Sequence, residues 1–358
     1  MSKNIKYTFE PDFAVPPGET LQETMESLGM TQKDLAIRTN LTVQTLNRIF
    51  KGEQPITYET ANRLELVTGV PARFWNNLES QYREGLAKIE ERKKLAEGLA
   101  WMKSIPVSEL IQRGAIKHYD DGILLLREVL SFYGVSSVEA WRAVWESSEV
   151  AARRSRCFET MPGPASAWIR LGELQAQGIT CKPYDRDKFL NALDRIRSLT
   201  REECIVFEPE MRNLCADSGV ALALVPEMKK VPWNGATRWL TPQKAMILLS
   251  LRGKKEDTFW FSFFHEAGHV LYDGKKDLYI NDNTVHDRHE ERAENFAADF
   301  LIPSEYNDRI QKSISKAEII IIASDLGIAP GIVAGRYQYL TNKWEYFKDL
   351  IRHLEWKK

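Results

Sequence analysis

Apolar residues in the N-terminal half recur every three to four positions, which is the spacing of amphipathic helices. The pattern begins at "GETLQETMESLG" (residues 18–29) and continues to about residue 80 as several short helices. Residues that commonly end helices separate them: Gly29, Asn40, Gly52 and Gly69. Residues 1–17 contain prolines at 11, 16 and 17 and lack the period. We therefore expect an irregular segment at 1–17 and an all-α domain at 18–80.

The pattern changes at about residue 200. Residues 81–200 keep a helical period and begin with a densely charged stretch, "AKIEERKKLAEG", which is typical of a solvated connecting helix. Beyond it, "GVALALVPEM" and "KAMILLSLRG" are short apolar runs bounded by turn residues, which favours strands. Helical patterns return in the last third. The chain is therefore expected to be multidomain, with a helical connector at 81–200 and an α+β domain with a small sheet at 201–358.

Composition excludes several classes of protein. Hydrophobic residues make up 43% and charged residues 28%, which indicates a globular protein rather than a disordered or fibrous one. Lys+Arg (49) and Asp+Glu (50) nearly cancel, so a nucleic-acid site must be a local patch. The sequence has no signal-peptide core, no long apolar span and no C-x-x-C pair, so we expect a cytoplasmic protein with no membrane segment and with reduced thiols.

The segment "FFHEAGHVLYD" (263–273) carries the clearest chemical signal. His265 and His269 are four residues apart, so on a helix they lie on one face about a turn apart. Zinc hydrolases need such a pair, a third ligand and an open position for water, and Glu266 is placed to take the water's proton. The alternative is a buried helix that carries two histidines by chance. Gly268 inside the predicted helix indicates that a neighbouring backbone approaches closely.

A third ligand is expected downstream, in "HEERAENFAADFLIP". Glu290 and Glu294 are four residues apart on one helical face, so one can bind the metal while the other orients a ligand histidine. Glu291 is a rival ligand, one position round the helix. An acidic pair on a helix is by itself more often a solvated surface, and the preceding H-E-x-x-H is what favours the metal site here.

Three separated motifs occur in order and together resemble the ImmA/IrrE family of bacterial metallopeptidases. They are "FSFFHEAGHVLY", "EERAENFAADFLIP" and "IIIIASDLGIAPGIVAGRYQYL", and the likeness covers residues 200–345. It implies a zincin-like metallopeptidase fold for residues 201–358. His265, Glu266 and His269 match the family's pattern outright, which implies a Zn²⁺ cofactor held by the two histidines and Glu266 as the catalytic base.

The resemblance also selects the third ligand. Glu290 lies three residues before Ala293, where the family carries an acidic residue, so it is implied as the third zinc ligand. The chain departs from the family at Ser262, where Thr is usual, and at Glu294, where Asn or Asp is usual. Neither departure removes a ligand. Glu294 is the residue expected to orient a ligand histidine.

The implied activity is zinc-dependent endopeptidase cleavage. Zinc polarises the scissile carbonyl and lowers the pKa of its water, while Glu266 takes the proton and passes it to the leaving amine. Candidates for stabilising the oxyanion are Tyr272, His286 and His289. Family members cleave repressors to relieve transcriptional silencing, which implies a protein substrate, either a repressor or an antitoxin.

A second motif, "MTQKDLAIRTNLTVQTLNRIFKGE", has the layout of a helix-turn-helix. Thr31 and Thr42 can each cap a helix, and Asn40 in the turn can adopt the left-handed conformation. Leu46 and Ile49 then face the core. The residues predicted to contact DNA are Gln32, Thr42, Gln44, Thr45, Asn47, Arg48 and Lys51. The alternative is an ordinary helical hairpin with a solvated polar face.

Residues 18–80 as a whole resemble the Xre-type repressors, and most strongly their HigA antitoxin branch, on "TGVPARFWNNLE". The resemblance implies binding to double-stranded operator DNA. We expect a homodimer, because one recognition helix reads too few bases alone.

Two hypotheses for the whole chain follow. The first is a transcription regulator fused to a zinc metallopeptidase. The second is a toxin–antitoxin component, a HigA-like antitoxin and autorepressor that binds a cognate toxin and uses the peptidase fold without catalysis. The intact set of two histidines and Glu266 favours the first, since a binding module has no need of the base.

Overall fold

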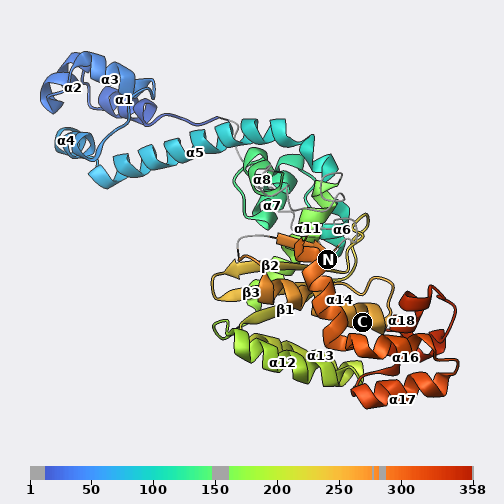
Figure 1. The fold of residues 1–358 in the computed structure, drawn as a ribbon. Helices are drawn as coiled ribbons and strands as arrows, with labels where there is room; N and C mark the ends of the chain where they lie inside the picture. The colour runs from blue at the N-terminus through green and yellow to red at the C-terminus, as the bar shows by residue number, and fades with distance from the viewer. Residues whose placement is uncertain (1–12, 147–160, 276–277, 282–287, 357–358) are drawn as a thin grey trace, which may run out of the picture. The chain divides into compact units, whose positions relative to one another are not determined.

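The computed structural model describes residues 13–146, 161–275, 278–281 and 288–356 (Figure 1). The chain divides into two compact units, Met1–Leu99 and Ala100–Lys358. The domain boundaries predicted at residues 17, 80 and 200 stay predictions, because a compact unit is defined by packing and not by function. The predicted fold class is confirmed: a helical N-terminal region precedes a region of helices around a small mixed sheet.

The N-terminal unit is a helical bundle, as its apolar period predicts. Its helices are α1 (Pro17–Ser27), α2 (Gln32–Thr39), α3 (Val43–Phe50), α4 (Tyr58–Thr68) and α5 (Ala72–Gly98). Each helix contributes a fully buried side chain to one core: Leu21, Leu35, Leu46, Leu64 and Trp75. The five helices therefore fold around a shared centre.

The turn between α2 and α3 forms as the sequence predicts. Thr31 accepts a hydrogen bond from the backbone N–H of Asp34, whose carboxylate accepts one from the N–H of Thr31, so the two make a capping box. Asn40 ends α2 in the left-handed conformation, with φ of 53°. Thr42 caps α3 by accepting from the N–H of Thr45. These local contacts fix the direction in which α3 leaves the turn.

Helix α5 is long, and most of it is solvated. Of its residues, all of which the structure describes, Ala72 and Trp75 are the buried ones. Its later turns carry exposed pairs of opposite charge at i,i+4, such as Glu84 with Lys88 and Glu90 with Lys94. Pairs of this kind support a helix that has little tertiary packing.

The C-terminal unit is built on a sheet with strand order β1-β3-β2-β4 among the described residues. Strand β1 (Val220–Leu224) runs parallel to β3 (Lys244–Leu249), and these are the two apolar runs that predict strands. Strand β2 (Gly235–Thr241) pairs antiparallel with both β3 and β4 (Leu278–Asn281). The apolar pattern does not reveal β2 or β4, since "GATRWLT" is half polar and "LYIN" has four residues.

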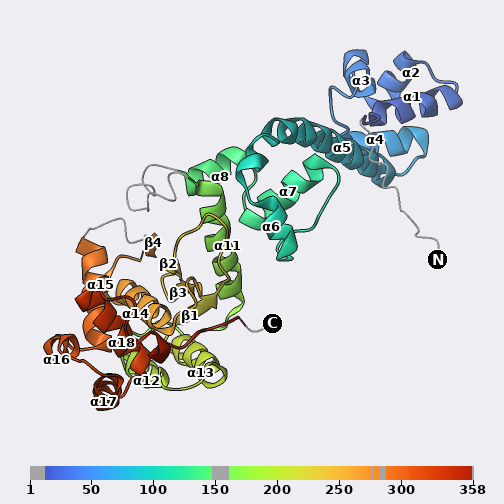
Figure 2. The same ribbon diagram turned by 90° about the vertical axis from the view of Figure 1, so that its right-hand side faces the viewer.

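Helices cover both faces of this sheet (Figure 2). Helix α11 (Pro162–Gly178) packs on one face, where a Cβ on Gly172 would lie 2.6 Å from Leu248 Cδ2. Helix α14 (Glu256–Tyr272) packs on the other face, in a core shared with Ile247 and Leu249. Successive strand residues point to opposite faces, so β2 offers alternate side chains to the two helices.

The remaining elements frame these layers. Before α11 come η1 (Trp101–Ser104), α6 (Val107–Gln112), α7 (Gly122–Tyr133) and α8 (Val138–Trp145). Between α11 and β1 come α12 (Arg186–Leu199) and α13 (Cys204–Asp217), which join the core around α14. After β4 come α15 (Arg288–Leu301), η2 (Ser304–Tyr306), α16 (Asn307–Gln311), α17 (Lys316–Leu326), α18 (Pro330–Thr341) and η3 (Lys348–Leu350).

In the part of the chain that the structure describes, no single helix has the length and apolar character needed to cross a membrane. The pair α17 and α18 passes by length and composition when taken together, but the two helices meet at a bend of 116°. Residues of both helices are buried in the core around α14.

Candidate metal centre and recognition helix

Helix α14 carries the H-E-x-x-H motif through the middle of the C-terminal core. Its first turn is acidic, with Glu256 and Asp257, which suits the positive end of the helix dipole. Most of its remaining residues are buried, because the sheet covers one side of the helix and α15 and α18 cover others. The apolar run "FWFSFF" before the motif supplies this packing. The two histidines are therefore held on a rigid, enclosed helix.

Gly268 lets α15 come close to α14. A Cβ on Gly268 would lie 3.0 Å from Ala293 Cα and 3.3 Å from Ala293 Cβ. The close backbone approach that Gly268 indicates in the sequence is thus present, and the neighbour is α15. This contact brings the first turn of α15, with Glu290, to the histidine face of α14.

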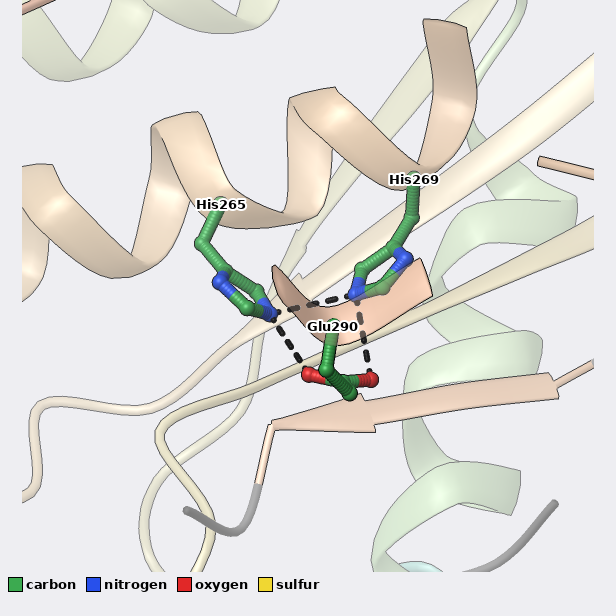
Figure 3. Close-up of side chains that lie close together, drawn as sticks. All are labelled: His265, His269 and Glu290. Carbon is green, nitrogen blue, oxygen red and sulfur yellow. Dashed lines mark hydrogen bonds and ion pairs between the residues drawn. The ribbon is translucent and has the colours of Figure 1, made fainter. Parts of the chain in front are cut away.

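The side chains of His265, His269 and Glu290 converge on one point (Figure 3). The Nε2 atoms of the two histidines are 3.1 Å apart. Glu290 Oε2 lies 3.1 Å from His265 Nε2, and its Oε1 lies 3.3 Å from His269 Nε2. One potential ligand atom from each residue lies within 4.8 Å of the others. Two imidazoles and a carboxylate are a donor set that suits zinc with an open fourth position, so these residues fit a Zn²⁺ ion.

Asp273 contacts the His269 ring nitrogen that faces away from Glu290. Its Oδ2 lies 2.6 Å from His269 Nδ1, so the histidine donates there and its Nε2 faces Glu290. Asp273 Oδ1 accepts from His289 Nδ1 at 2.7 Å and from Arg292. Tyr279 of β4 stacks on the His269 ring, with centroids 4.7 Å apart. The orientation of His269 is therefore fixed on three sides.

The sequence predicts that Glu294 orients a ligand histidine, and it does not predict a role for Asp273. In the structure Glu294 is exposed on α15, and among the described residues it makes no hydrogen bond to either histidine. Glu291, the rival third ligand, is also exposed. The signal for Asp273 was present in "HVLYD", because a residue four positions after His269 lies on the same helical face. The roles of these residues stay predictions.

Glu266 is fully buried beside the histidines. Its Oε2 accepts a hydrogen bond of 2.6 Å from the Thr237 hydroxyl on β2. Its Oε1 is buried and has no hydrogen-bond partner among the described residues. An unpaired buried carboxylate oxygen is costly unless a water or ligand satisfies it. The motif's carboxylate thus has one oxygen held and one oxygen available.

The electrostatics of the three acids and bases separate their roles. Burial raises the pKa of Glu266, and the charges of His265 and His269 lower it. Burial is the larger effect, so the pKa is about 7. Burial also acts to raise the pKa of Glu290, but the hydrogen bonds with His265 and His269 hold it down at about 2. Burial lowers the pKa of His269, yet its bonds to Asp273 and Glu290 raise it to about 10. Glu290 is thus an anion suited to a cation, and Glu266 is a base near neutrality.

Two of the three oxyanion candidates fall within the described residues. His289 donates to Asp273 and is partly exposed at the first turn of α15. Tyr272 is exposed at the last turn of α14, where the guanidinium groups of Arg186 and Arg292 lie 5.6 and 5.7 Å from its ring. His286 lies outside the described residues.

In the N-terminal unit, helix α3 presents the polar face that the sequence predicts. Leu46 and Ile49 are buried, and Gln44, Asn47 and Arg48 are exposed on the opposite side. The other predicted DNA-contacting residues lie beside them: Thr42 and Lys51 are exposed, and Gln32 and Thr45 are half-buried.

Two contacts hold this polar face in place. Gln32 donates to Asn47 Oδ1 at 2.8 Å and so ties α2 to α3. The Thr42 and Thr45 hydroxyls are 2.9 Å apart. The polar face is therefore partly ordered before any ligand binds.

Comparison with known proteins matches one family to each unit. Residues 21–75 match the helix-turn-helix family model, and residues 224–337 match the M78 peptidase family, described as the IrrE N-terminal-like domain. An uncharacterized HTH-type transcriptional regulator of Escherichia coli, YddM, is 28% identical over 75 residues, which is 21% of this chain and 78% of that protein.

Three solved structures are also similar to part of this chain. One is PA4674 of Pseudomonas aeruginosa in complex with its operator DNA, at 29% identity, 21% of this chain, 82% of that chain and a TM-score of 0.20. One is an addiction module antidote protein of a HigA family from Coxiella burnetii, which is 30% identical. The match covers 24% of this chain and 92% of that chain, with a TM-score of 0.22. The third is the P. aeruginosa antitoxin HigA with the higBA promoter, which is 28% identical. The match covers 23% of this chain and 89% of that chain, with a TM-score of 0.22.

The motifs, the convergence of His265, His269 and Glu290, and the family matches agree on the nature of the two units. The chain carries an N-terminal helix-turn-helix domain of the Xre type and a C-terminal IrrE N-terminal-like domain of the M78 peptidase family.

Proposed function

We propose that the protein is a DNA-binding regulator whose C-terminal unit is a zinc-dependent endopeptidase that cleaves a repressor or antitoxin. The observation that carries the proposal is the convergence of His265, His269 and Glu290 beside a buried Glu266, one oxygen of which has no hydrogen-bond partner among the described residues. A structural metal site would have no use for this carboxylate, because Glu266 is not one of the converging ligand residues. Such a carboxylate suits a hydrolytic site.

In the proposed mechanism each residue has a separate task. A zinc ion bound at these three residues would polarise the scissile carbonyl and make the attacking water more acidic. Glu266 accepts the proton of that water on its free oxygen and later gives it to the leaving amine. Asp273 keeps His269 in the tautomer that presents Nε2. The pKa of Glu266, raised by burial to about 7, suits a group that first accepts and then donates a proton.

The N-terminal unit is proposed to bind double-stranded operator DNA as a homodimer. The exposed side chains of Gln44, Asn47 and Arg48 on α3 can hydrogen-bond base edges in the major groove, and Lys51 suits a phosphate. The match of residues 21–75 to the helix-turn-helix family supports this proposal. A regulator of this kind acts in the cytoplasm.

The test compares cells that carry the wild type or the Glu266→Gln variant. Gln keeps the size of Glu but cannot accept a proton, so zinc content and folding should be retained while cleavage falls by about 10²–10⁴-fold. Newly formed protein N-termini are catalogued by mass spectrometry in both strains. Glu305→Gln, a change of the same chemistry at an exposed position outside the candidate site, serves as the control and should cleave like the wild type.

Cleavage products present in wild-type cells and missing with Glu266→Gln support the proposal. If the two strains have identical N-termini and identical levels of every repressor and of the protein itself, the endopeptidase function is refuted. Capture of a small toxin by the intact chain in that case would establish the antitoxin hypothesis instead.

A further inference from the structure

Strand β2 forms a cradle for the carboxylate of Glu266. Gly235 and Thr237 are two residues apart on the strand, so both face α14. A Cβ on Gly235 would lie 2.5 Å from Glu266 Oε1 and 2.8 Å from its Cγ. The absence of a side chain at Gly235 therefore makes the space that the carboxylate occupies.

Thr237 fixes one end of that carboxylate. Its hydroxyl lies 2.6 Å from Glu266 Oε2 and 3.1 Å from the backbone carbonyl oxygen of Glu266. A hydroxyl has one proton to donate, and the shorter contact to the charged acceptor takes it. Thr237 and Glu266 are both buried, so no bulk water competes for this bond. The bond therefore selects one rotamer of the Glu266 carboxylate.

The strand itself is anchored on its other face. The next residue, Arg238, forms an ion pair with Glu173 of α11, and Glu173 also accepts from Arg170 at 2.9 Å. Glu173 is buried, and the Arg238 guanidinium lies 5.8 Å from the centre of the Trp145 ring. Because Arg238 is held by α11, the backbone at Thr237 has little freedom to move along the sheet.

We propose that Thr237 is a positioning residue for Glu266: its hydroxyl holds Oε2, so that Oε1 is the oxygen that accepts the proton of the attacking water. The inference rests on the proposed endopeptidase function and names the atom that performs its proton transfer. In this step the O–H bond of the water breaks, a new O–H bond forms on Glu266 Oε1, and the hydroxide oxygen adds to the carbonyl carbon. Thr237 does not touch the substrate.

The experiment uses the full-length protein loaded with Co²⁺ and titrated with acetohydroxamic acid. A hydroxamate binds such a metal through its two oxygens and gives up its hydroxyl proton to a neighbouring base, so its affinity reports whether Glu266 presents a free oxygen. Binding is followed by the change in visible absorption of the Co²⁺ protein. Thr237→Val removes the hydroxyl and keeps the branched shape of the side chain, and Thr237→Ser restores the hydroxyl.

Thr237→Val should weaken hydroxamate binding by about tenfold or more, the size of a lost hydrogen bond to a charged group. Thr237→Ser should stay within about twofold of the wild type, and the metal content of both should equal that of the wild type. Thr241→Val, at the exposed end of the same strand, is the control and should bind like the wild type. Gly235→Ala provides a second variant that keeps the hydroxyl but places a methyl group against Oε1, and it should also weaken binding.

Equal hydroxamate affinity in the wild type, Thr237→Val and Gly235→Ala would overturn the role of the cradle and leave the endopeptidase proposal intact. If Thr237→Val does not fold, normal binding by Gly235→Ala overturns it in the same way. A wild type that takes up no Co²⁺ would instead refute the proposed metal centre, and the positioning role with it. A loss in Thr237→Val that Thr237→Ser fails to restore would show that shape, rather than the hydroxyl, is required.

Discussion

The two carboxylate oxygens of Asp273 accept hydrogen bonds from different residues. One oxygen orients His269, and the other holds His289 and Arg292 from the first turn of α15. The same side chain thus sets the tautomer of a proposed ligand and joins the two helices that supply the site. The hydrogen bonds from His269 and His289 outweigh the effect of burial and lower the pKa of Asp273, so it is an anion at neutral pH.

Asp273→Asn is expected to weaken zinc binding by about 10–100-fold, because Asn retains the shape but loses the charge that supports His269. Zinc affinity is measured by competition with a chromogenic chelator. Glu294→Gln is the matched control, since Glu294 is exposed and should leave the affinity unchanged. A larger loss with Glu294→Gln than with Asp273→Asn would restore the role that the sequence assigned to Glu294.

Residue types at fixed spacing made the centre of the site predictable. The helical spacing of His265, Glu266 and His269 predicts their grouping, and the family resemblance implies Glu290. The structure brings the three predicted ligands, His265, His269 and Glu290, together. Thr237 could not be predicted, because its contact with Glu266 depends on how β2 packs against α14. A threonine on a half-polar strand carries no sign of its partner 29 residues away.

At the scale of elements, the contact between α14 and α15 determines where Glu290 lies. Gly268 allows the two helices to approach, and Ala293 and Ala297 are the small buried residues that α15 contributes. Small residues at a crossing let helix axes approach more closely than leucines would. The third ligand is therefore positioned by helix packing, and not by a loop.

Gly268→Leu should destabilise the protein by about 1–3 kcal/mol through overpacking, although leucine has the higher helix propensity. It should also weaken zinc binding by moving Glu290 away. Gly178→Leu is the matched control, because a Cβ on Gly178, at the end of α11, meets nothing within 4 Å. Chemical denaturation gives the free energy of unfolding of each variant. Equal values for the two variants would contradict a close helix contact at Gly268.

The elements themselves were predictable where local patterns are strong. The helix caps at Thr31 and Thr42 and the turn at Asn40 follow from short-range hydrogen bonding, and β1 and β3 follow from apolar runs. Strands β2 and β4 depend on pairing partners far along the chain, which the local pattern does not report. The helical pattern of residues 162–178 likewise does not reveal that α11 covers the sheet.

At the scale of the whole molecule, the two units divide the chemistry between them. The polar face of α3 belongs to the unit Met1–Leu99, and the proposed metal centre belongs to Ala100–Lys358. Each unit has its own buried core. A point change in one site should therefore leave the fold of the other unit intact.

Arg48→Ala should weaken binding to the protein's own promoter by about 1–3 kcal/mol if Arg48 contacts a base, while zinc content stays at the wild-type level. Glu266→Gln should show the reverse, with normal promoter binding and lost cleavage. Gel shifts with the full-length chain and a fixed promoter fragment measure promoter binding, elemental analysis measures zinc content, and mass spectrometry of newly formed N-termini measures cleavage. An unchanged shift for the double change Gln44→Ala, Arg48→Ala would refute the chosen recognition face.

Strand β2 also determines where the chain can gain or lose a residue. Its pairing with β3 is regular from Gly235 to Trp239, and a register irregularity lies between Trp239 and Thr241. An added residue at that irregularity extends a bulge that already exists. An added residue before Thr237 would shift the following residues to the opposite faces of the strand, taking the Thr237 hydroxyl away from Glu266 and the Arg238 guanidinium away from Glu173. The seven-residue strand should therefore tolerate an insertion near Thr241, whereas an insertion before Thr237 should abolish the contact with Glu266.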